Sequence, residues 1–187
     1  MLKVNLLPFP TLKTERLIMR EIVMEDAYDF FIIRSNKEIM SAIDREPIKT
    51  IEEIKTFIEL LKTNLIANKG IAWALCLKAN NKMIGHFGFH QIDEINHRAE
   101  IGYALLPEFQ GLGYAHEALT AMLEFAFIKF NFHSIEANIN PTNSHSIKLV
   151  EKCCFVKEAH FKENYYCNGV FLDSAIYSVL KSNYLKQ

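Results

Sequence analysis

The amino-acid sequence predicts a single α/β domain in which helices flank a mixed β-sheet. Three observations lead to this prediction. The chain has 187 residues, half of them hydrophobic, which is enough to bury one core. Segments with strand and helix periodicity follow one another in the order β-α-α-β-β-β-α-β-α-β-β. No internal repeat, low-complexity tract or linker divides them, so we expect one domain over residues 1–187.

The first third of the chain predicts one strand and two helices, with a short segment of weaker helical pattern at 37–42 between the helices. Polar and apolar residues alternate over Thr14–Glu21, which is the period of a half-buried strand. Thr50 and Glu53 form the pattern of a capping box before the clearest amphipathic segment of the sequence. Helical spacing of apolar residues predicts helices over 26–34 and 51–68, and more weakly over 37–42.

The remainder of the chain predicts six strands and two helices. Strands are expected over 71–77, 83–90, 98–106, 134–139, 155–166 and 170–180. One helix is expected over 113–130, and Thr142 or Asn143 caps a second one that runs to about residue 152. Turns at 78–82 and at Cys167–Gly169 join neighbouring strands into hairpins.

The composition argues against several classes of protein. The net charge is −1, so a broad basic surface for nucleic acid is not expected. The N-terminus lacks the apolar core of a secretory signal, and no apolar run reaches the roughly 18–20 residues that span a bilayer. The four cysteines form no C-x-x-C pair, and His86 and His90 share a strand face without a third ligand. We therefore expect a cytoplasmic protein with reduced thiols and no metal site.

A glycine-containing loop follows the strand that ends near residue 106. Gly111 and Gly113 allow positive φ and leave the backbone N–H groups uncovered, directly before a helix N-terminus. Such a loop can bind an anion, most often phosphate. A Rossmann fingerprint is excluded because His116 stands where its third glycine belongs, and no P-loop lysine is present. The alternative is a tight strand–helix turn without a ligand.

The segment Gln110-Gly-Leu-Gly-Tyr-Ala115 resembles the acetyl-CoA pyrophosphate loop, Gln/Arg-x-x-Gly-x-Gly/Ala, of the GCN5-related N-acetyltransferases (GNAT). Further matches to the RimJ/RimL-like branch of that family recur in order along the chain, at Leu12–Leu17, Ala99–Tyr103, Asn143–Ser146, Glu151–Phe155 and Asn168–Tyr177. One position departs from the pattern, because Cys154 replaces the family glycine before Phe155. The resemblance implies a mostly antiparallel central sheet whose splayed strands form an acetyl-CoA cleft.

The resemblance also implies roles for individual residues. The main chain of the loop would hold the pyrophosphate, through Gln110, Gly111, Leu112, Gly113, Tyr114 and Ala115. Backbone groups of Tyr103, Leu105 and Leu106 would hold the pantetheine arm, together with Asn143. Glu100 is the expected general base, Leu105 or Leu106 the oxyanion donor, and Ser146 the group that protonates the leaving thiolate. A structural reading gives Glu100 a salt bridge to Arg98 or a lysine, and makes Asn143 only a helix cap.

The resemblance predicts transfer of an acetyl group from acetyl-CoA directly to a primary amine. The expected acceptor is a protein N-terminal α-amino group, as in ribosomal proteins. The alternatives are a small amine such as a polyamine, amino acid or aminoglycoside, and a non-catalytic acyl-CoA-binding module. No direct partner among nucleic acids or membranes is expected, and the chain is predicted to act as a monomer or homodimer.

Overall fold

The structure is a computed structural model that describes residues 2–186. Its centre is an eight-stranded sheet with the order β1-β2-β3-β4-β5-β6-β8-β7, in which only the β5–β6 pair is parallel. The strands are β1 (Leu12–Lys13), β2 (Leu17–Glu21), β3 (Ile71–Leu77), β4 (Met83–Asp93), β5 (Arg98–Leu105), β6 (Ser134–Ile139), β7 (Val156–Cys167) and β8 (Val170–Leu180). The predicted fold class, with a mixed and mostly antiparallel sheet, is confirmed.

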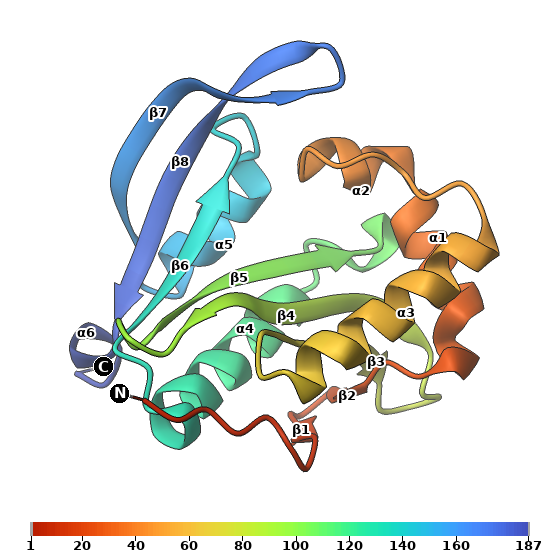
Figure 1. Cartoon of the computed structure of the whole chain (residues 1–187), viewed down its shortest axis with the longest axis horizontal. Coiled ribbons are helices and arrows are strands. Elements are labelled where there is room, and N and C mark those ends of the chain that lie inside the picture. The colour runs from red at the N-terminus through yellow and green to blue at the C-terminus, as the bar shows by residue number, and fades with distance from the viewer. Residues whose placement is uncertain (1, 187) are drawn as a thin grey trace.

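Helices cover both faces of this sheet (Figure 1). One group packs on one face: η1 (Met24–Asp26), α1 (Ala27–Ser35), α2 (Lys37–Ala42) and α3 (Ile51–Ile66). The other face carries α4 (Tyr114–Phe125), its π-helical continuation η3 (Ala126–Phe130) and α5 (Ser144–Lys152). The short helices η2 (Pro107–Phe109) and α6 (Lys181–Tyr184) follow β5 and β8.

Strand β3 shows how the two faces differ. Trp73 and Leu75 are fully buried against the α4 side, whereas Ala74 and Cys76 face α1 and α3. Successive side chains of a strand point to opposite faces, so this alternation places the large side chains on the α4 side. On the α1–α3 side, Ala72 has only a methyl group and Gly88 and Gly102 have no side chain, which leaves room for a cavity.

The strands β5 and β6 separate after three residue pairs. Arg98, Ala99 and Glu100 pair with residues 134, 135 and 136, and no later pair forms between the two strands. Figure 1 shows β5 and β6 diverging from this point. The separation confirms the predicted splayed strands, and it leaves the β6-facing edge of β5 without a strand partner beyond Glu100.

The structure corrects three predicted boundaries. The strand predicted from residue 14 begins at Leu17, because Thr14 closes a turn in which its N–H donates to the Leu17 carbonyl at 3.1 Å. The helix predicted over 113–130 is α-helical only as far as Phe125, and Asn131 ends the following π-turn at φ 56°. Strand β4 continues to Asp93, beyond the predicted end at residue 90.

None of the helices formed by residues 2–186 has both the length and the apolar character needed to cross a membrane.

Candidate active site

The glycine loop after β5 presents unpaired backbone donors. Gly111 and Gly113 adopt φ values of 72° and 85°, and a Cβ atom at Gly111 would meet no atom within 4 Å. The first helical hydrogen bond of α4 runs from the Glu117 N–H to the Gly113 carbonyl at 3.0 Å. Within residues 2–186 the N–H groups of residues 111–116 have no backbone acceptor. An anion therefore fits this loop at the positive end of the α4 dipole.

Gln110 differs from the other loop residues. Its N–H donates to the Pro107 carbonyl at 3.0 Å, and its side-chain Nε2 donates to the Leu105 carbonyl at 3.0 Å. Both groups thus fix the loop to the end of β5. The Gln110 N–H, which was predicted to contact the pyrophosphate, is therefore engaged within the protein. The donors that remain for a pyrophosphate are those of residues 111–116.

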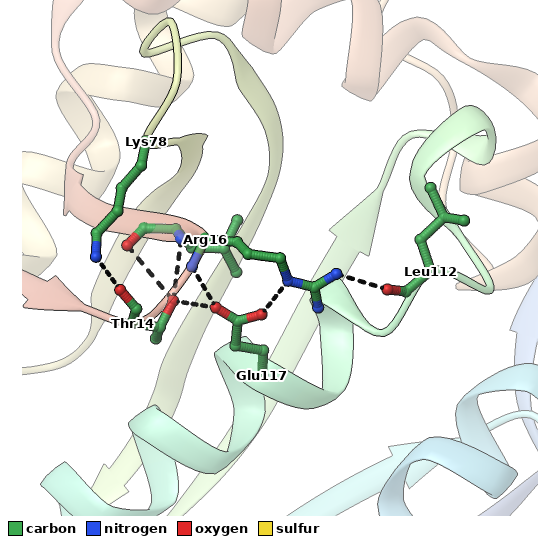
Figure 2. Close-up of polar contacts among 6 residues, drawn as sticks. Thr14, Arg16, Lys78, Leu112 and Glu117 are labelled. Carbon is green, nitrogen blue, oxygen red and sulfur yellow. Dashed lines mark hydrogen bonds and ion pairs between the residues drawn. The ribbon is translucent and has the colours of Figure 1, made fainter.

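A polar cluster braces the loop from behind (Figure 2). The Arg16 guanidinium donates to the Leu112 carbonyl at 2.9 Å and to the Glu117 carboxylate at 2.6 Å. That carboxylate also accepts the Arg16 N–H at 2.8 Å and the Thr14 hydroxyl. Arg16 lies 4.3 Å above the Tyr114 ring. The turn between β1 and β2 therefore holds the Leu112 peptide with its carbonyl toward Arg16.

Strand pairing decides which backbone groups of β5 face the splay. The Leu106 N–H donates to the Ile84 carbonyl at 2.9 Å, so this pair is hydrogen-bonded in the antiparallel β4–β5 ladder. Hydrogen-bonded and non-hydrogen-bonded pairs alternate along such a ladder. The N–H groups of Tyr103 and Leu105 consequently point away from β4, toward the gap beside β6. Of the two predicted oxyanion donors, the Leu105 N–H points into the gap, whereas the Leu106 N–H is bonded to β4.

Glu100 occupies the apex of the splay. It is the last residue of β5 that pairs with β6, and its side chain is 17% exposed. One carboxylate oxygen accepts Gln91 Nε2 at 2.9 Å, and the other lies 3.9 Å from His90 Nε2. Burial raises the pKa of Glu100, while the neighbouring His90 opposes the rise. Arg98 pairs with Glu136 instead, so the structural alternative of an Arg98 salt bridge does not hold.

Asn143 and Ser146 lie at the start of α5, on the wall of the same cleft. Asn143 caps the helix, because its Oδ1 accepts the Ser146 N–H at 3.0 Å, and its Nδ2 donates to the Ala42 carbonyl at 2.7 Å. Both ends of the Asn143 amide are therefore engaged within the protein. The Ser146 hydroxyl lies near the phenol of Tyr103, whose pKa burial raises to about 12. That phenol is buried without a hydrogen-bond partner among the described residues.

A roof closes the cleft above the sheet. Asp44, just after α2, adopts a left-handed backbone with φ 51°. Its carboxylate accepts Asn140 Nδ2 at 3.0 and 3.1 Å and also the Tyr165 hydroxyl. Burial and this carboxylate together raise the pKa of Tyr165. The Cys167 thiol donates to the Asp44 carbonyl at 3.3 Å. The roof lies over a cavity of about 640 Å³, partly open to solvent, between the α1–α3 face of the sheet and the β6–α5 loop.

Basic residues in this cavity were not singled out in the sequence. Arg34, Arg45 and Lys69 line it, and so does His86, for which the sequence analysis considered and set aside a metal site. The sequence did not indicate a role for Arg34, because a basic residue in the last turn of a helix is ordinary.

Within the described part of the chain, no three histidine, cysteine or acidic side chains are grouped as metal ligands. Burial raises the pKa of Cys76 and of Cys153 to about 11, so both are protonated at neutral pH.

Comparison with known proteins identifies the family. The family model of the acetyltransferase (GNAT) domain matches residues 16–156. An uncharacterized N-acetyltransferase of Bacillus subtilis is 32% identical over 173 residues, which are 92% of this chain and 98% of that relative. The spermidine N-acetyltransferase from Vibrio cholerae, solved with CoA and spermine, superposes with a TM-score of 0.81 at 27% identity. It covers 90% of this chain and 98% of its own. Ribosomal-protein-S5-alanine acetyltransferase from Vibrio fischeri gives a TM-score of 0.81 at 25% identity, with coverages of 94% and 98%.

The open glycine loop, the splayed β5 edge and the domain match agree with one another. The chain belongs to the GNAT family of acetyltransferases and is an acetyl-CoA-dependent N-acetyltransferase.

Proposed function

We propose that this enzyme acetylates a small primary amine held in the roofed cavity beside β5. The observation that carries the proposal is the roof itself, in which Asp44 bonds to Asn140 and Tyr165 across the cleft. A partly enclosed volume of about 640 Å³ suits a small molecule. A protein N-terminus, the acceptor placed first from the sequence, would have to pass beneath these contacts. The narrower assignment to the RimJ/RimL-like branch remains a prediction.

The residues present fit acetyl-CoA, which supplies the activated acetyl group as a thioester. The N–H groups of residues 111–116 would hold the diphosphate, with Arg16 and Glu117 fixing the loop behind them. The unpaired edge of β5 would hold the pantetheine amides as an added strand is held, through Tyr103 and Leu105. Asn143 contributes by ordering the first turn of α5 rather than through a spare amide.

Proton transfer is assigned to Glu100 and Ser146. A primary alkyl amine with a pKa of about 10.4 is almost wholly protonated at neutral pH, so it must lose a proton before it reacts. Glu100 accepts that proton, directly or through a water, and its raised pKa brings it closer to the working range. The nitrogen–carbon bond forms as the carbon–sulfur bond breaks, and the second proton that the nitrogen loses neutralises the departing thiolate. The Leu105 N–H stabilises the carbonyl oxygen, and Ser146 donates to the departing sulfur.

None of the cysteines is assigned a covalent role. The thiols of Cys76 and Cys153 are buried and protonated, whereas a nucleophilic cysteine needs a lowered pKa. Direct transfer between acetyl-CoA and the amine is therefore the simplest mechanism for this site.

The test is a thiol-release assay with acetyl-CoA and two acceptor panels, one of small amines and one of peptides with different N-terminal residues. We expect turnover with at least one small amine at a kcat/KM well above that of every peptide. Turnover confined to peptides would contradict the proposed acceptor class and would support a protein N-terminus as the acceptor. CoA binding without turnover of any acceptor would favour the acyl-CoA-binding module.

A further inference from the structure

The cavity has a basic end that the proton-transfer chemistry does not use. Arg34 comes from the last turn of α1, Arg45 follows Asp44 in the roof, and His86 stands in β4. All three line the cavity. In residues 2–186, neither guanidinium has a carboxylate within ion-pair distance. The two positive charges also act on each other, because the pKa of Arg34 is lowered by burial and by the charge of Arg45.

Two buried nitrogens at this end lack hydrogen-bond partners. Arg34 Nε and His86 Nε2 are inaccessible to solvent, and neither bonds to another described residue. The apolar parts of both side chains are packed, since the Arg34 guanidinium lies 5.0 Å from the Phe57 ring centre and the His86 ring meets Phe30 edge-on at 5.1 Å. Buried polar groups are nearly always paired, so two orphaned nitrogens at one end of a cavity indicate a missing ligand.

Stacking on Phe57 explains part of this arrangement but not all of it. A cation above an aromatic ring is favourable, and it would hold Arg34 in place in an empty cavity. It leaves Nε unpaired, and it does not explain why Arg45 and His86 lie nearby. Arg34 is partly buried, whereas Arg45 is exposed. A partly buried cation without a counter-ion is unfavourable, and an anionic ligand would reduce that cost.

The acidic groups of the cavity cannot serve as that anion. The Asp44 carboxylate is occupied by Asn140 and Tyr165. Glu100 lies at the other end, since it pairs with His90 in the β4–β5 ladder whereas His86 pairs with Ala104. Four residues along a strand span about 13 Å. The cavity thus has a carboxylate end at Glu100 and a basic end at Arg34 and His86, and Arg45 lies between them, since its charge acts on both Glu100 and Arg34.

We propose that the acetyl acceptor is an amine that also carries a carboxylate, such as an amino acid. The carboxylate would lie between the guanidinium groups of Arg34 and Arg45 and accept a hydrogen bond from His86 Nδ1, while the amine points toward Glu100. This inference rests on the proposed function, because it places the acceptor in the same cavity.

The charge state of His86 agrees with this role. Burial and the nearby Arg34 charge lower the pKa of His86 to about 3, so its ring is neutral at working pH. A neutral imidazole can still donate one N–H to a carboxylate. The polyamine acceptors of the Vibrio cholerae relative bear only positive charges, which this end of the cavity would repel.

The first experiment compares acceptors that differ only in the carboxylate. The pairs are γ-aminobutyrate with butylamine, ornithine with putrescine, and lysine with cadaverine, each assayed by thiol release from acetyl-CoA. We expect kcat/KM to be about 10- to 100-fold higher for the carboxylated member of at least one pair. Equal or lower values for the carboxylated members of all pairs, or a preference for spermidine, would overturn the inference while leaving acetyl transfer intact.

The second experiment replaces Arg34. Arg34→Gln should abolish the preference within the pair while the KM for acetyl-CoA stays unchanged, and Arg34→Lys should restore part of the preference. Lys55→Gln is the matched control, because it removes an exposed positive charge from α3 outside the cavity. Retention of the full preference in a folded Arg34→Gln variant would refute the carboxylate site.

A binding measurement decides the inference independently of turnover. N-acetyl-γ-aminobutyrate and Nε-acetyllysine retain the carboxylate, and calorimetry on the CoA-bound enzyme measures their affinity. We expect at least one to bind to the wild type and to lose about tenfold or more in affinity in Arg34→Gln. Failure of both to bind would contradict the carboxylate site. Binding without any acetyl transfer would support the carboxylate site and contradict the proposed function.

Discussion

Replacing Gly113 with valine tests whether the loop before α4 binds the cofactor. Gly113 has φ +85°, and a Cβ atom there would lie 3.3 Å from an Arg16 nitrogen. A left-handed backbone costs a residue with a side chain roughly 1–2 kcal/mol, and β-branched residues tolerate it least. If Arg16 shifts, its hydrogen bond to the Leu112 carbonyl is weakened, which costs about 1 kcal/mol more. The total is about 2–3 kcal/mol.

This strain should appear in cofactor binding. The loop can relax only by leaving the conformation that exposes its N–H groups. Binding of acetyl-CoA must then restore that conformation, so the free energy of binding is reduced by the strain energy. At about 1.4 kcal/mol for each factor of ten, the KM for acetyl-CoA should rise about 30- to 150-fold. Steady-state kinetics with acetyl-CoA as the varied substrate and calorimetry with CoA measure the change.

A control for strain alone is available in the β7–β8 turn. Gly169 has φ +87°, and a Cβ atom there would meet no atom within 4 Å, so Gly169→Ala carries a similar backbone penalty away from the loop. It should lower thermal stability without changing the KM for acetyl-CoA. A folded Gly113→Val variant whose KM lies within about twofold of the wild type would refute the assignment of the loop.

Three further variants test the contact behind the loop, the proposed base and the left-handed residue before Phe155. Arg16→Gln should raise the KM for acetyl-CoA about tenfold at unchanged kcat, because the Leu112 peptide loses its brace; equal KM values in Arg16→Gln and Lys55→Gln would contradict this. Glu100→Gln should remove the acidic limb of the pH–rate profile, and a profile that superimposes on that of the wild type would exclude Glu100 as the base. The raised pKa also means that the folded state binds more protons than the unfolded one, so this carboxylate destabilises the fold increasingly as pH rises past its ordinary pKa. Glu100→Gln should therefore match or exceed the wild type in stability at neutral pH, as thermal unfolding would show. Cys154→Gly should raise the free energy of unfolding by about 0.5 kcal/mol, since Cys154 holds φ 68°; a clear loss of stability in denaturant titration would show that its side-chain contacts outweigh the backbone relief.

The sequence predicted those parts of the fold that local patterns determine. The strand over 134–139 and the helix over 37–42 have the predicted bounds, because periodicity and caps are local signals. The positive φ values of Gly111 and Gly113 could be expected for the same reason. The turn at Thr14 could not, because its stability depends on Glu117, about 100 residues away.

The cavity lay beyond the reach of sequence patterns. The roof joins Asp44, Asn140 and Tyr165, which come from three separate segments of the chain. Acidic residues of the loops are engaged within the protein, since Asp44 is bonded across the cleft, Asp93 caps its own turn and Glu94 accepts the Val4 N–H. Only the tertiary structure shows which charges remain available.

The available charges are informative because each one weakens the fold. Glu100 is buried with a raised pKa, and Arg34 and His86 bury nitrogens without partners among the described residues. A protein selected for stability alone would pair such groups or replace them with apolar ones. All three line the same cavity, whereas the buried Asp26 away from it is fully bonded to Arg20 and Val23. The unpaired nitrogens of Arg34 and His86 and the carboxylate of Glu100 therefore lie where a ligand with a carboxylate at one end and an amine at the other would engage them.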